Sequence, residues 1–453
     1  MFQATNPTTG ESLQPYPLME AGELSRALAS SFEAYGQWRK TTFAERAALL
    51  SKVADVMEAN EEALAKVMTL EMGKPIREGR GEVKKSVGCA RHYAENAEAY
   101  LAPVPIASDA TRSYVQNLPL GPILGILPWN APFWLAFRFC APALMAGNAC
   151  LMKHDPHVPA SAEAIVDCFV RAGAPAGLMQ NLRIDKDQVA ELLSDDRVRG
   201  VSLTGSSAAG SQVASLAGKA MKPGVFELGG SDPSLVLADA DLDKAAEVLT
   251  LSRIINAGQS CIAAKRIIVE ASVYDAFVEK FKARLAALKM GDPAEEDTQV
   301  GPIAREDLRK SLHRQLTETI RQGGRCLLGG TLPEGKGFFY PVTLLVDVTQ
   351  DMTAACEETF GPIGVVMKAT SEKEALEIAN NTPYGLAASV WTADAEKAER
   401  MARDLEAGQV AINGIVKTDP RLPSGGIKRS GLGRELGPHG IREFVNAQQV
   451  WVG

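Results

Sequence analysis

The chain has 453 residues, about three times a typical domain of ~150, and 46% of them are hydrophobic, so two or three globular units can form. Basic residues are scattered and the formal net charge is −7, which argues against nucleic acid as a partner. The opening residues do not look like a targeting signal, and no apolar run reaches the ~18 residues of a membrane span, so we expect a cytoplasmic protein that does not bind membranes.

The early residues predict helices. Residues 21–72 show helical periodicity, with a capping box at Thr42–Glu45, and Gly73 and Pro75 end this region. From Pro122 the pattern changes to short apolar runs that alternate with amphipathic segments. Strands are expected at 123–127, 149–152 and 201–203, with helices near 133–145 and 160–172. This alternation predicts βαβ units and a parallel sheet.

A second α/β stretch follows Gly229 and Gly230. It contains expected strands at 234–237 and 267–269 and expected helices near 242–255 and 274–288. No Pro-rich or Ser-rich linker separates the two stretches, so we expect a wide interface between them, with a cleft suited to a binding site.

The seven cysteines are widely spaced and form no C-x-x-C pair, which argues against a disulfide scaffold and structural zinc. His154 and His157 lack further ligands nearby, so no metal site is expected. Cys261 differs from the other cysteines because it lies in the glycine-containing loop 256–261, where a thiolate could act as a nucleophile. We expect the other six to be buried and unreactive.

Several residues at expected strand ends could serve a site. The Asn130 amide could stabilise an oxyanion or simply close a turn, and Lys153 could bind ribose or phosphate or merely mark the end of its strand. The small-residue turn at 204–206 could offer free N–H groups to a pyrophosphate, although many such turns look alike. Glu227 lies in an apolar segment, where it could be a general base or be satisfied by backbone amides.

Together these segments resemble the aldehyde dehydrogenase superfamily over nearly the whole chain. The motifs that carry the resemblance occur in the family's order: Pro-Trp-Asn at 128–130, Thr-Gly-Ser at 204–206, Glu-Leu-Gly-Gly at 227–230, Gly-Gln-x-Cys at 258–261, Glu-Glu-x-Phe-Gly-Pro at 357–362 and the glycine-rich segment 425–435.

The resemblance implies a mechanism with three principal residues. Cys261 would attack the aldehyde, the Asn130 side chain with the Cys261 N–H would form the oxyanion hole, and Glu227 would activate water to hydrolyse the thioester. Relatives that transfer the acyl group to coenzyme A lack a glutamate at this position, which favours hydrolysis here.

The resemblance also implies a nicotinamide cofactor. The expected cofactor-binding residues are Ile126, Leu127, Pro128, Trp129, Lys153, Pro156, Thr204, Gly205, Ser206, Leu228, Glu358 and Phe360. Many relatives that prefer NAD carry a glutamate where this chain has Pro156. A carboxylate there would repel a 2′-phosphate, so its absence favours NADP or the use of both cofactors.

Within the family, the chain looks most like short bacterial succinate semialdehyde dehydrogenases. Arg138 matches an arginine that binds the substrate carboxylate in that group, and its apolar neighbours would penalise an unpaired charge. Ser424 replaces a usual phenylalanine in a loop that borders the substrate tunnel of relatives, so another carboxy-aldehyde, or a general aliphatic or aromatic aldehyde, is the alternative substrate. A catalytically silent binding protein is a further alternative, although Cys261, Glu227 and Asn130 are all present.

By resemblance, the α/β fold would contain a Rossmann-like cofactor domain from 1–100 and 121–228 and an α/β catalytic domain from 229–425. A small β oligomerisation unit would come from 101–120 and 426–453. Its strands, near 114–120 and 444–452, could extend a partner's sheet, so a homodimer or homotetramer is expected.

Overall fold

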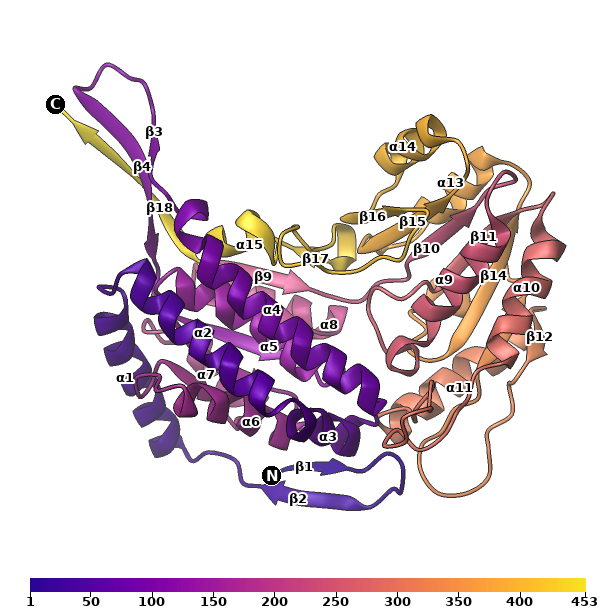
Figure 1. The fold of residues 1–453 in the computed structure, drawn as a ribbon, viewed down its shortest axis with the longest axis horizontal. Helices are drawn as coiled ribbons and strands as arrows, with labels where there is room; N and C mark the ends of the chain where they lie inside the picture. Colours follow the sequence, from indigo (N-terminus) through magenta and orange to yellow (C-terminus); the bar gives the residue numbers. More distant parts are fainter.

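The computed structural model describes residues 1–453 and has two lobes, each built on its own β-sheet (Figure 1). The six-stranded lobe contains a sheet that is parallel except for β17 at one edge. Its strand order is β17 (Gly431–Leu432), β9 (Gly224–Glu227), β8 (Gly200–Thr204), β5 (Pro122–Leu127), β6 (Ala149–His154) and β7 (Met179–Asn181).

Helices pack on both faces of this sheet. Ile123 and Cys150 lie in one buried cluster, while their neighbours Leu124 and Leu151 lie in another, because successive strand residues point to opposite faces. The helices are α1 (Ala21–Trp38), α2 (Phe43–Ala59), α3 (Glu61–Met72), α4 (Ile76–Tyr100), α5 (Pro132–Met145), α6 (Pro159–Arg171), α7 (Lys186–Ser194), α8 (Ser207–Lys219) and α15 (Gly437–Arg442).

The seven-stranded lobe repeats this plan with a sheet that is parallel except for β12 at its edge. The strand order is β12 (Arg325–Leu328), β13 (Thr343–Val346), β14 (Ile363–Ala369), β11 (Arg266–Glu270), β10 (Pro233–Val236), β15 (Ala387–Trp391) and β16 (Gln409–Ile412). Its helices are α9 (Leu242–Ile254), α10 (Tyr274–Ala286), α11 (Glu306–Arg321), α12 (Thr353–Cys356), α13 (Glu372–Asn380) and α14 (Ala395–Asp404).

The parallel βαβ pattern expected from the sequence is confirmed in both lobes, with bounds that differ by only a few residues. The expected capping box is also confirmed, because Thr42 accepts from the Glu45 N–H while the Glu45 carboxylate accepts from the Thr42 N–H. Gly73 ends α3 in the left-handed conformation, with φ of 75°. The chain does not leave the helical layer there, however, since the 25-residue α4 begins at Ile76.

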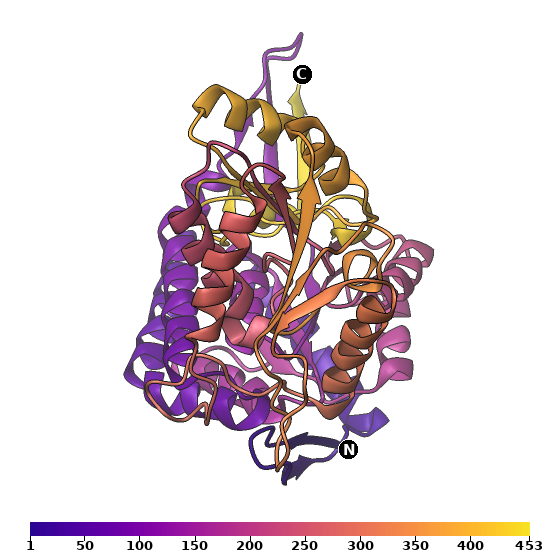
Figure 2. The same ribbon diagram turned by 90° about the vertical axis from the view of Figure 1, so that its right-hand side faces the viewer.

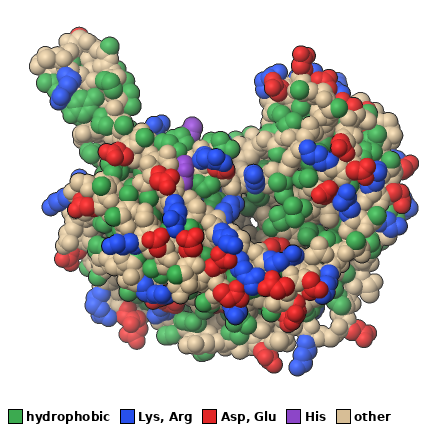
Figure 3. All heavy atoms as spheres, viewed as in Figure 1, with side chains coloured by type: hydrophobic (Ala, Val, Ile, Leu, Met, Phe, Trp, Pro, Cys, Tyr) green, Lys and Arg blue, Asp and Glu red, His purple; other side chains and the backbone are tan.

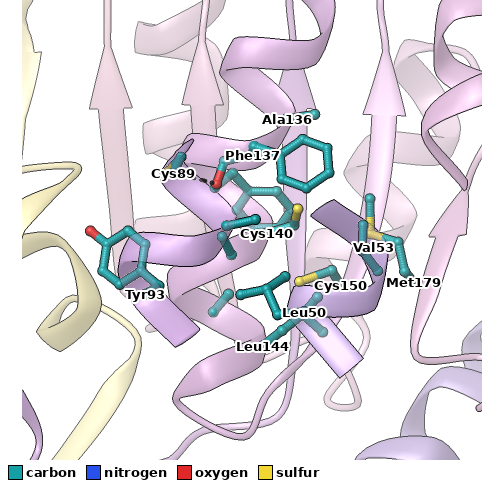
Figure 4. Close-up of a cluster of buried hydrophobic side chains, with 14 of the residues drawn as sticks. Leu50, Val53, Cys89, Tyr93, Ala136, Phe137, Cys140, Leu144, Cys150 and Met179 are labelled. Carbon is teal, nitrogen blue, oxygen red and sulfur yellow. Dashed lines mark hydrogen bonds between the residues drawn. The ribbon is translucent and has the colours of Figure 1, made fainter. Parts of the chain in front are cut away.

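The largest core cluster lies between helices α2, α4, α5 and α6 and one face of the six-stranded sheet. In Figure 4, Cys89, Cys140 and Cys150 point into this apolar cluster. Cys168 is buried as well, so the expectation of buried cysteines holds for these four. It is wrong for Cys356, which is exposed at the end of the short helix α12, and for Cys326, which is half-buried on the edge strand β12.

A small three-stranded sheet projects from the six-stranded lobe (Figures 1 and 2). It contains β3 (Val104–Pro105), β4 (Arg112–Pro119) and β18 (Val445–Val452), and β18 pairs antiparallel with β4 along its whole length. Of the tail after residue 425, only β18 joins this sheet, because β17 extends the six-stranded sheet and α15 packs against α4 and α5.

Two further features complete the fold. A hairpin of β1 (Phe2–Thr5) and β2 (Ser12–Tyr16) lies at the opposite end of the molecule from the C-terminus (Figure 2). None of the helices combines the length and the apolar character needed to cross a membrane.

Candidate functional site

A cavity of about 360 Å³ lies where the two lobes meet, and side chains from both lobes line it. Asn130, Arg138 and Glu227 reach it from the six-stranded lobe, and Cys261 reaches it from the seven-stranded lobe. Figure 3 shows a hollow between the lobes, with lysine and arginine side chains beside it. The structure therefore brings together four residues that are separate in the sequence.

The loop that carries Cys261 has an unusual backbone. It begins with the 3-10 turn η1 (Ile255–Gly258), in which Asn256, Ala257 and Gly258 have φ of 54°, 53° and 76°. Left-handed conformations are costly for residues other than glycine, so the surrounding structure must impose them. At Gly258 a side chain is also excluded, because a Cβ would lie 2.4 Å from the carbonyl carbon of Gly361.

Buried cations hold this strained loop. Arg253, which has no exposed surface, donates to the Gly258 carbonyl at 2.6 Å and to the Ala264 carbonyl at 3.3 Å. The Lys265 ammonium, also fully buried, donates to the carbonyls of Ser260 and Cys261. Charge-assisted bonds to these carbonyls can offset the backbone strain.

Electrostatics around Cys261 act in two directions. Burial raises the pKa of the Cys261 thiol to about 11, while the positive charges of Lys265 and Arg138 lower it. Glu227 and Glu358 raise it further. The thiol therefore needs a proton acceptor within the cavity to become a nucleophile at neutral pH.

Asn130 lies just after β5, in the turn that leads into α5. Its side-chain amide donates to the Gln259 carbonyl at 3.1 Å, and its own carbonyl accepts from the Asn256 amide at 2.8 Å and the Lys74 ammonium at 2.9 Å. The bonds with Gln259 and Asn256 join the two lobes beside the Cys261 loop. They place the Asn130 side-chain amide next to the backbone that precedes Cys261. One of its two N–H groups is used in the bond to Gln259, so the other can donate to a ligand.

Glu227 is the last residue of β9 and is almost completely buried. Burial raises its pKa to about 7, although the nearby Arg138 guanidinium lowers it. Its Oε1 has no hydrogen-bond partner within the protein. The structure therefore does not support the alternative in which backbone amides satisfy this carboxylate. A carboxyl group with an unbonded oxygen and a pKa near 7 suits a general base.

Arg138 on α5 is buried among carboxylates. Its Nη2 lies 2.5 Å from Glu435 Oε2 and 3.5 Å from Glu227 Oε2, and it donates to Ser424 Oγ at 3.3 Å. The positive charge of Arg138 is therefore balanced by two acidic groups, while its Nε has no protein partner. The sequence pattern did not single out Glu435, whose only signal was its place in the glycine-rich segment 425–435.

The carboxyl ends of β6 and β8 form an edge that fits a phosphorylated nucleotide. Lys153 near the end of β6 makes no salt bridge and lies over the Phe2 ring, and Pro156 follows it without adding a charge. Thr204 at the end of β8 has a buried hydroxyl without a partner. Ser206 caps α8 by accepting from the Ala209 N–H, so the first turn of this helix points its other N–H groups outward.

A second group of expected cofactor residues lies between the two lobes. Glu358 Oε1 accepts from the Gly230 N–H at 3.1 Å and lies 3.3 Å from the Lys265 ammonium. The rings of Trp129 and Phe360 meet edge to face at 5.8 Å. Gly229 leaves space for the carboxylate, because a Cβ there would lie 2.5 Å from Glu358 Oε2.

The remaining expected cofactor residues are placed differently. Leu127 belongs to the hydrophobic core and is 2% exposed, so only its backbone can face a ligand. Leu228 packs against Gly210 of α8, and Ile126 and Pro128 are partly exposed near the end of β5. Gly205 begins the turn into α8. The structure thus spreads these residues along the sheet edge instead of gathering them around the thiol.

The whole chain compares closely with known proteins. Residues 1–450 match the Aldehyde dehydrogenase family. A relative from Mycobacterium ulcerans named succinate-semialdehyde dehydrogenase [NADP(+)] 1 is 46% identical, with 99% of each chain covered. A relative from Mycolicibacterium paratuberculosis named succinate-semialdehyde dehydrogenase [NADP(+)] is 45% identical, covering 99% of this chain and 96% of the relative.

Solved structures agree. The structure of Gox0499 has a TM-score of 0.98 and 39% identity, covering 100% of this chain and 99% of that one. Succinic semialdehyde dehydrogenase from Streptococcus pyogenes, solved in complex with NADP+, also has a TM-score of 0.98, with 36% identity and full coverage of both chains. The expected fold is confirmed, and the chain belongs to the aldehyde dehydrogenase family.

Proposed function

We propose that this enzyme oxidises succinate semialdehyde to succinate and uses NADP+ in preference to NAD+. The observation that carries the proposal is the interlobe cavity, which holds a thiol, a carboxylate with a pKa near 7 and a buried guanidinium. Relatives named as NADP(+)-dependent succinate-semialdehyde dehydrogenases, 45–46% identical over nearly the full chain, support the substrate and the cofactor.

In the proposed reaction the Cys261 sulfur adds to the aldehyde carbon, and its proton passes to Glu227 directly or through water. The Asn130 amide and the Cys261 N–H stabilise the oxyanion of this adduct. NADP+, when bound, supplies the acceptor for the hydride that leaves the same carbon. The product on the protein is then a thioester of Cys261.

Hydrolysis of the thioester depends on Glu227 in this proposal. The carboxylate removes a proton from water, the water oxygen bonds to the acyl carbon, and the carbon–sulfur bond breaks to release succinate and regenerate Cys261. A pKa near 7 is favourable because the group can both accept and return protons at neutral pH.

Arg138 contributes to substrate recognition in the proposal because its guanidinium lines the cavity. Nη2 is engaged by Glu435, Glu227 and Ser424, whereas Nη1 has no protein partner and can donate to an oxygen of the distal carboxylate. Ser424 supports the guanidinium from the loop side, where a phenylalanine could not accept a hydrogen bond.

The choice of NADP+ depends on charge at the ribose. Lys153 forms no salt bridge in the structure, and Pro156 stands where a glutamate would repel a 2′-phosphate. Burial lowers the pKa of Lys153 most, while the Asp155 carboxylate raises it and the Lys186 ammonium lowers it. The Lys153 ammonium forms no salt bridge, so it can pair with a phosphorylated ribose.

We also propose a homodimer or a homotetramer. The strand β18 has an unpaired edge, and the small sheet exposes Val104, Ile106 and Trp451, with 48%, 51% and 54% of their surfaces accessible. Free strand edges beside exposed apolar side chains readily pair with a second chain. Sedimentation velocity should give one species of two or four chains, and a monomer at micromolar concentration would contradict this.

The deciding experiment measures steady-state NAD(P)H formation with succinate semialdehyde, glutarate semialdehyde, hexanal and benzaldehyde, each with both cofactors. We expect the highest kcat/KM for succinate semialdehyde with NADP+. A flat or hydrophobic preference would leave the family membership intact but overturn the proposed substrate, and a clear preference for NAD+ would overturn the proposed cofactor.

A further inference from the structure

The charged side chains that line the interlobe cavity differ in whether the protein already neutralises them. Lys74 is paired with Glu82, whose other oxygen accepts from the backbone N–H groups of Phe133 and Trp134. Glu78 accepts from the Asn256 N–H at 2.7 Å. Arg138, as described above, faces two carboxylates. Lys74 and Arg138 each have a carboxylate within ion-pair distance, so neither of these cations is left without an acidic partner.

Lys85 is the exception among the partly buried groups. It lies on α4, and its Nζ donates to Thr418 Oγ1 at 2.7 Å and sits 4.0 Å from the centre of the Trp134 ring. No carboxylate lies within ion-pair distance of this ammonium. A lysine ammonium has three N–H donors, and the structure shows a protein acceptor for one of them.

The neighbours of Lys85 connect it to the groups that hold Arg138. The Lys85 ammonium lies over the indole ring of Trp134, and the Arg138 guanidinium lies 6.0 Å from the centre of the same ring. Thr418 and Ser424, which bond to Lys85 and Arg138 respectively, lie in the same loop, and both also line the cavity. Two cations from two helices thus form one wall, and only one of them is neutralised by acidic groups.

We propose that Lys85, with the Thr418 hydroxyl, anchors the distal carboxylate of an ω-oxo carboxylic acid substrate in this cavity. The inference rests on the proposed oxidation of succinate semialdehyde and assigns most of the charge recognition to Lys85, with Arg138 as a supplementary donor. The Thr418 oxygen accepts from Lys85, which leaves its O–H free to donate to the carboxylate.

The energetic reasoning concerns where a negative charge can enter the cavity. A carboxylate that approached Arg138 alone would meet the fields of Glu227 and Glu435 at the same place. Near Lys85 it would complete an ion pair that the protein leaves open, in a partly dehydrated setting where charge-assisted bonds are strong. Burial and Arg138 lower the pKa of Lys85 to about 8, and an arriving carboxylate would favour the charged form.

The test compares Lys85→Met with wild type on a charged and an uncharged aldehyde of the same chain length. With succinate semialdehyde, we expect kcat/KM to fall by about 10- to 100-fold through KM, the range expected for one charge-assisted contact. With butanal, kcat/KM should change by less than about threefold, because that substrate has no charge to lose. Equal losses on both aldehydes, or no loss on succinate semialdehyde, would overturn the role of Lys85.

Two further variants sharpen the test. Lys84→Met is the matched control, since Lys84 is the adjacent residue on α4 and is exposed beside Glu61. It should leave kcat/KM unchanged for both aldehydes. Thr418→Val keeps the shape of the side chain but removes the hydroxyl. It should lower kcat/KM for succinate semialdehyde but not for butanal, and by less than Lys85→Met does. A loss in Lys84→Met that matched Lys85→Met would contradict the inference.

A binding measurement separates this inference from the proposed function. Succinate should protect Cys261 from alkylation by iodoacetamide in wild type, and Lys85→Met should need at least about tenfold more succinate for equal protection. If wild type shows no preference for succinate semialdehyde over butanal, the proposed function itself fails. If wild type shows the preference and Lys85→Met keeps both the preference and the protection, only the assignment to Lys85 fails.

Discussion

The two lobes supply different kinds of structure to the same cavity. On the six-stranded side, Lys153 lies near the end of strand β6 and Ser206 caps helix α8, both in regular backbone. On the seven-stranded side, the Cys261 loop contains three consecutive left-handed residues and is held by the buried Arg253 and Lys265. The cofactor edge is therefore built from regular strand ends and turns, whereas the nucleophile is held in a strained and internally bonded loop.

This difference suggests how each side works. A dinucleotide must bind and leave in every turnover, so weak contacts at exposed strand ends suffice. A nucleophile must hold one position relative to its oxyanion donors, so the cost of strain is offset by buried hydrogen bonds. Matched substitutions on the two sides can test this contrast.

The largest effect should come from Cys261→Ala. Removing the thiol eliminates the covalent step, so aldehyde oxidation should fall on the order of 10⁴-fold or more, while NADP+ binding changes little because the cofactor edge lies on the other lobe. Steady-state NADPH formation and titration of cofactor binding by fluorescence measure the two quantities. Substantial residual turnover would show that another group is the nucleophile.

The next largest effect should come from Lys265→Met, with Lys153→Met on the other lobe as its control. Loss of the Lys265 ammonium removes a donor from each of the Ser260 and Cys261 carbonyls and leaves Glu358 without its cation, so the free energy of unfolding should fall by about 3–5 kcal/mol.

The same change should raise the pKa of Cys261, since Lys265 is the strongest influence that lowers it. Slower alkylation of Cys261 at a given pH would show this shift. Lys153→Met should weaken NADP+ binding but change the free energy of unfolding by less than about 0.5 kcal/mol. Equal destabilisation by both variants would remove the contrast between the lobes.

A smaller effect is expected from Gly258→Ala. The added Cβ would meet the Gly361 backbone at a residue with φ of 76°, so we expect a loss of about 2–4 kcal/mol in unfolding free energy. Gly205→Ala on the cofactor edge is the control, because its Cβ would lie 3.6 Å from Leu203, an ordinary contact. Thermal unfolding of both variants makes the comparison, and a stable Gly258→Ala protein would show that the loop can relax.

The smallest effect is the dependence on pH through Glu227. Its folded pKa of about 7 means that the carboxylate is mostly protonated below pH 7 and ionised above it. Because a base must be ionised to activate water, kcat should fall about tenfold for each pH unit below 7 and level off above it. Stopped-flow and steady-state rates of thioester turnover would measure this limb. If kcat of Glu227→Gln fell in the same way below pH 7, the titration would belong to another group.

Much of the fold could be predicted because parallel strands buried on both faces have short, continuous apolar runs. The helix α4 was not anticipated, although it contacts α2, α3 and α5. Its sequence is rich in charge and contains Gly79, Gly81 and Gly88, which weaken the helical pattern. Gly79 has a packing reason, since a Cβ there would press against Ala65 of α3.

The sequence by itself determined the type of chemistry, because Cys261, Glu227 and Asn130 lie in motifs whose residue types the reaction needs. The tertiary structure decided the electrostatic state of these groups. Only the fold brings Glu435 from the C-terminal tail to Arg138 on α5 and leaves Lys85 of α4 beside the cavity without an acidic partner. Pairing and burial depend on which distant elements come into contact, and local sequence patterns do not encode those contacts.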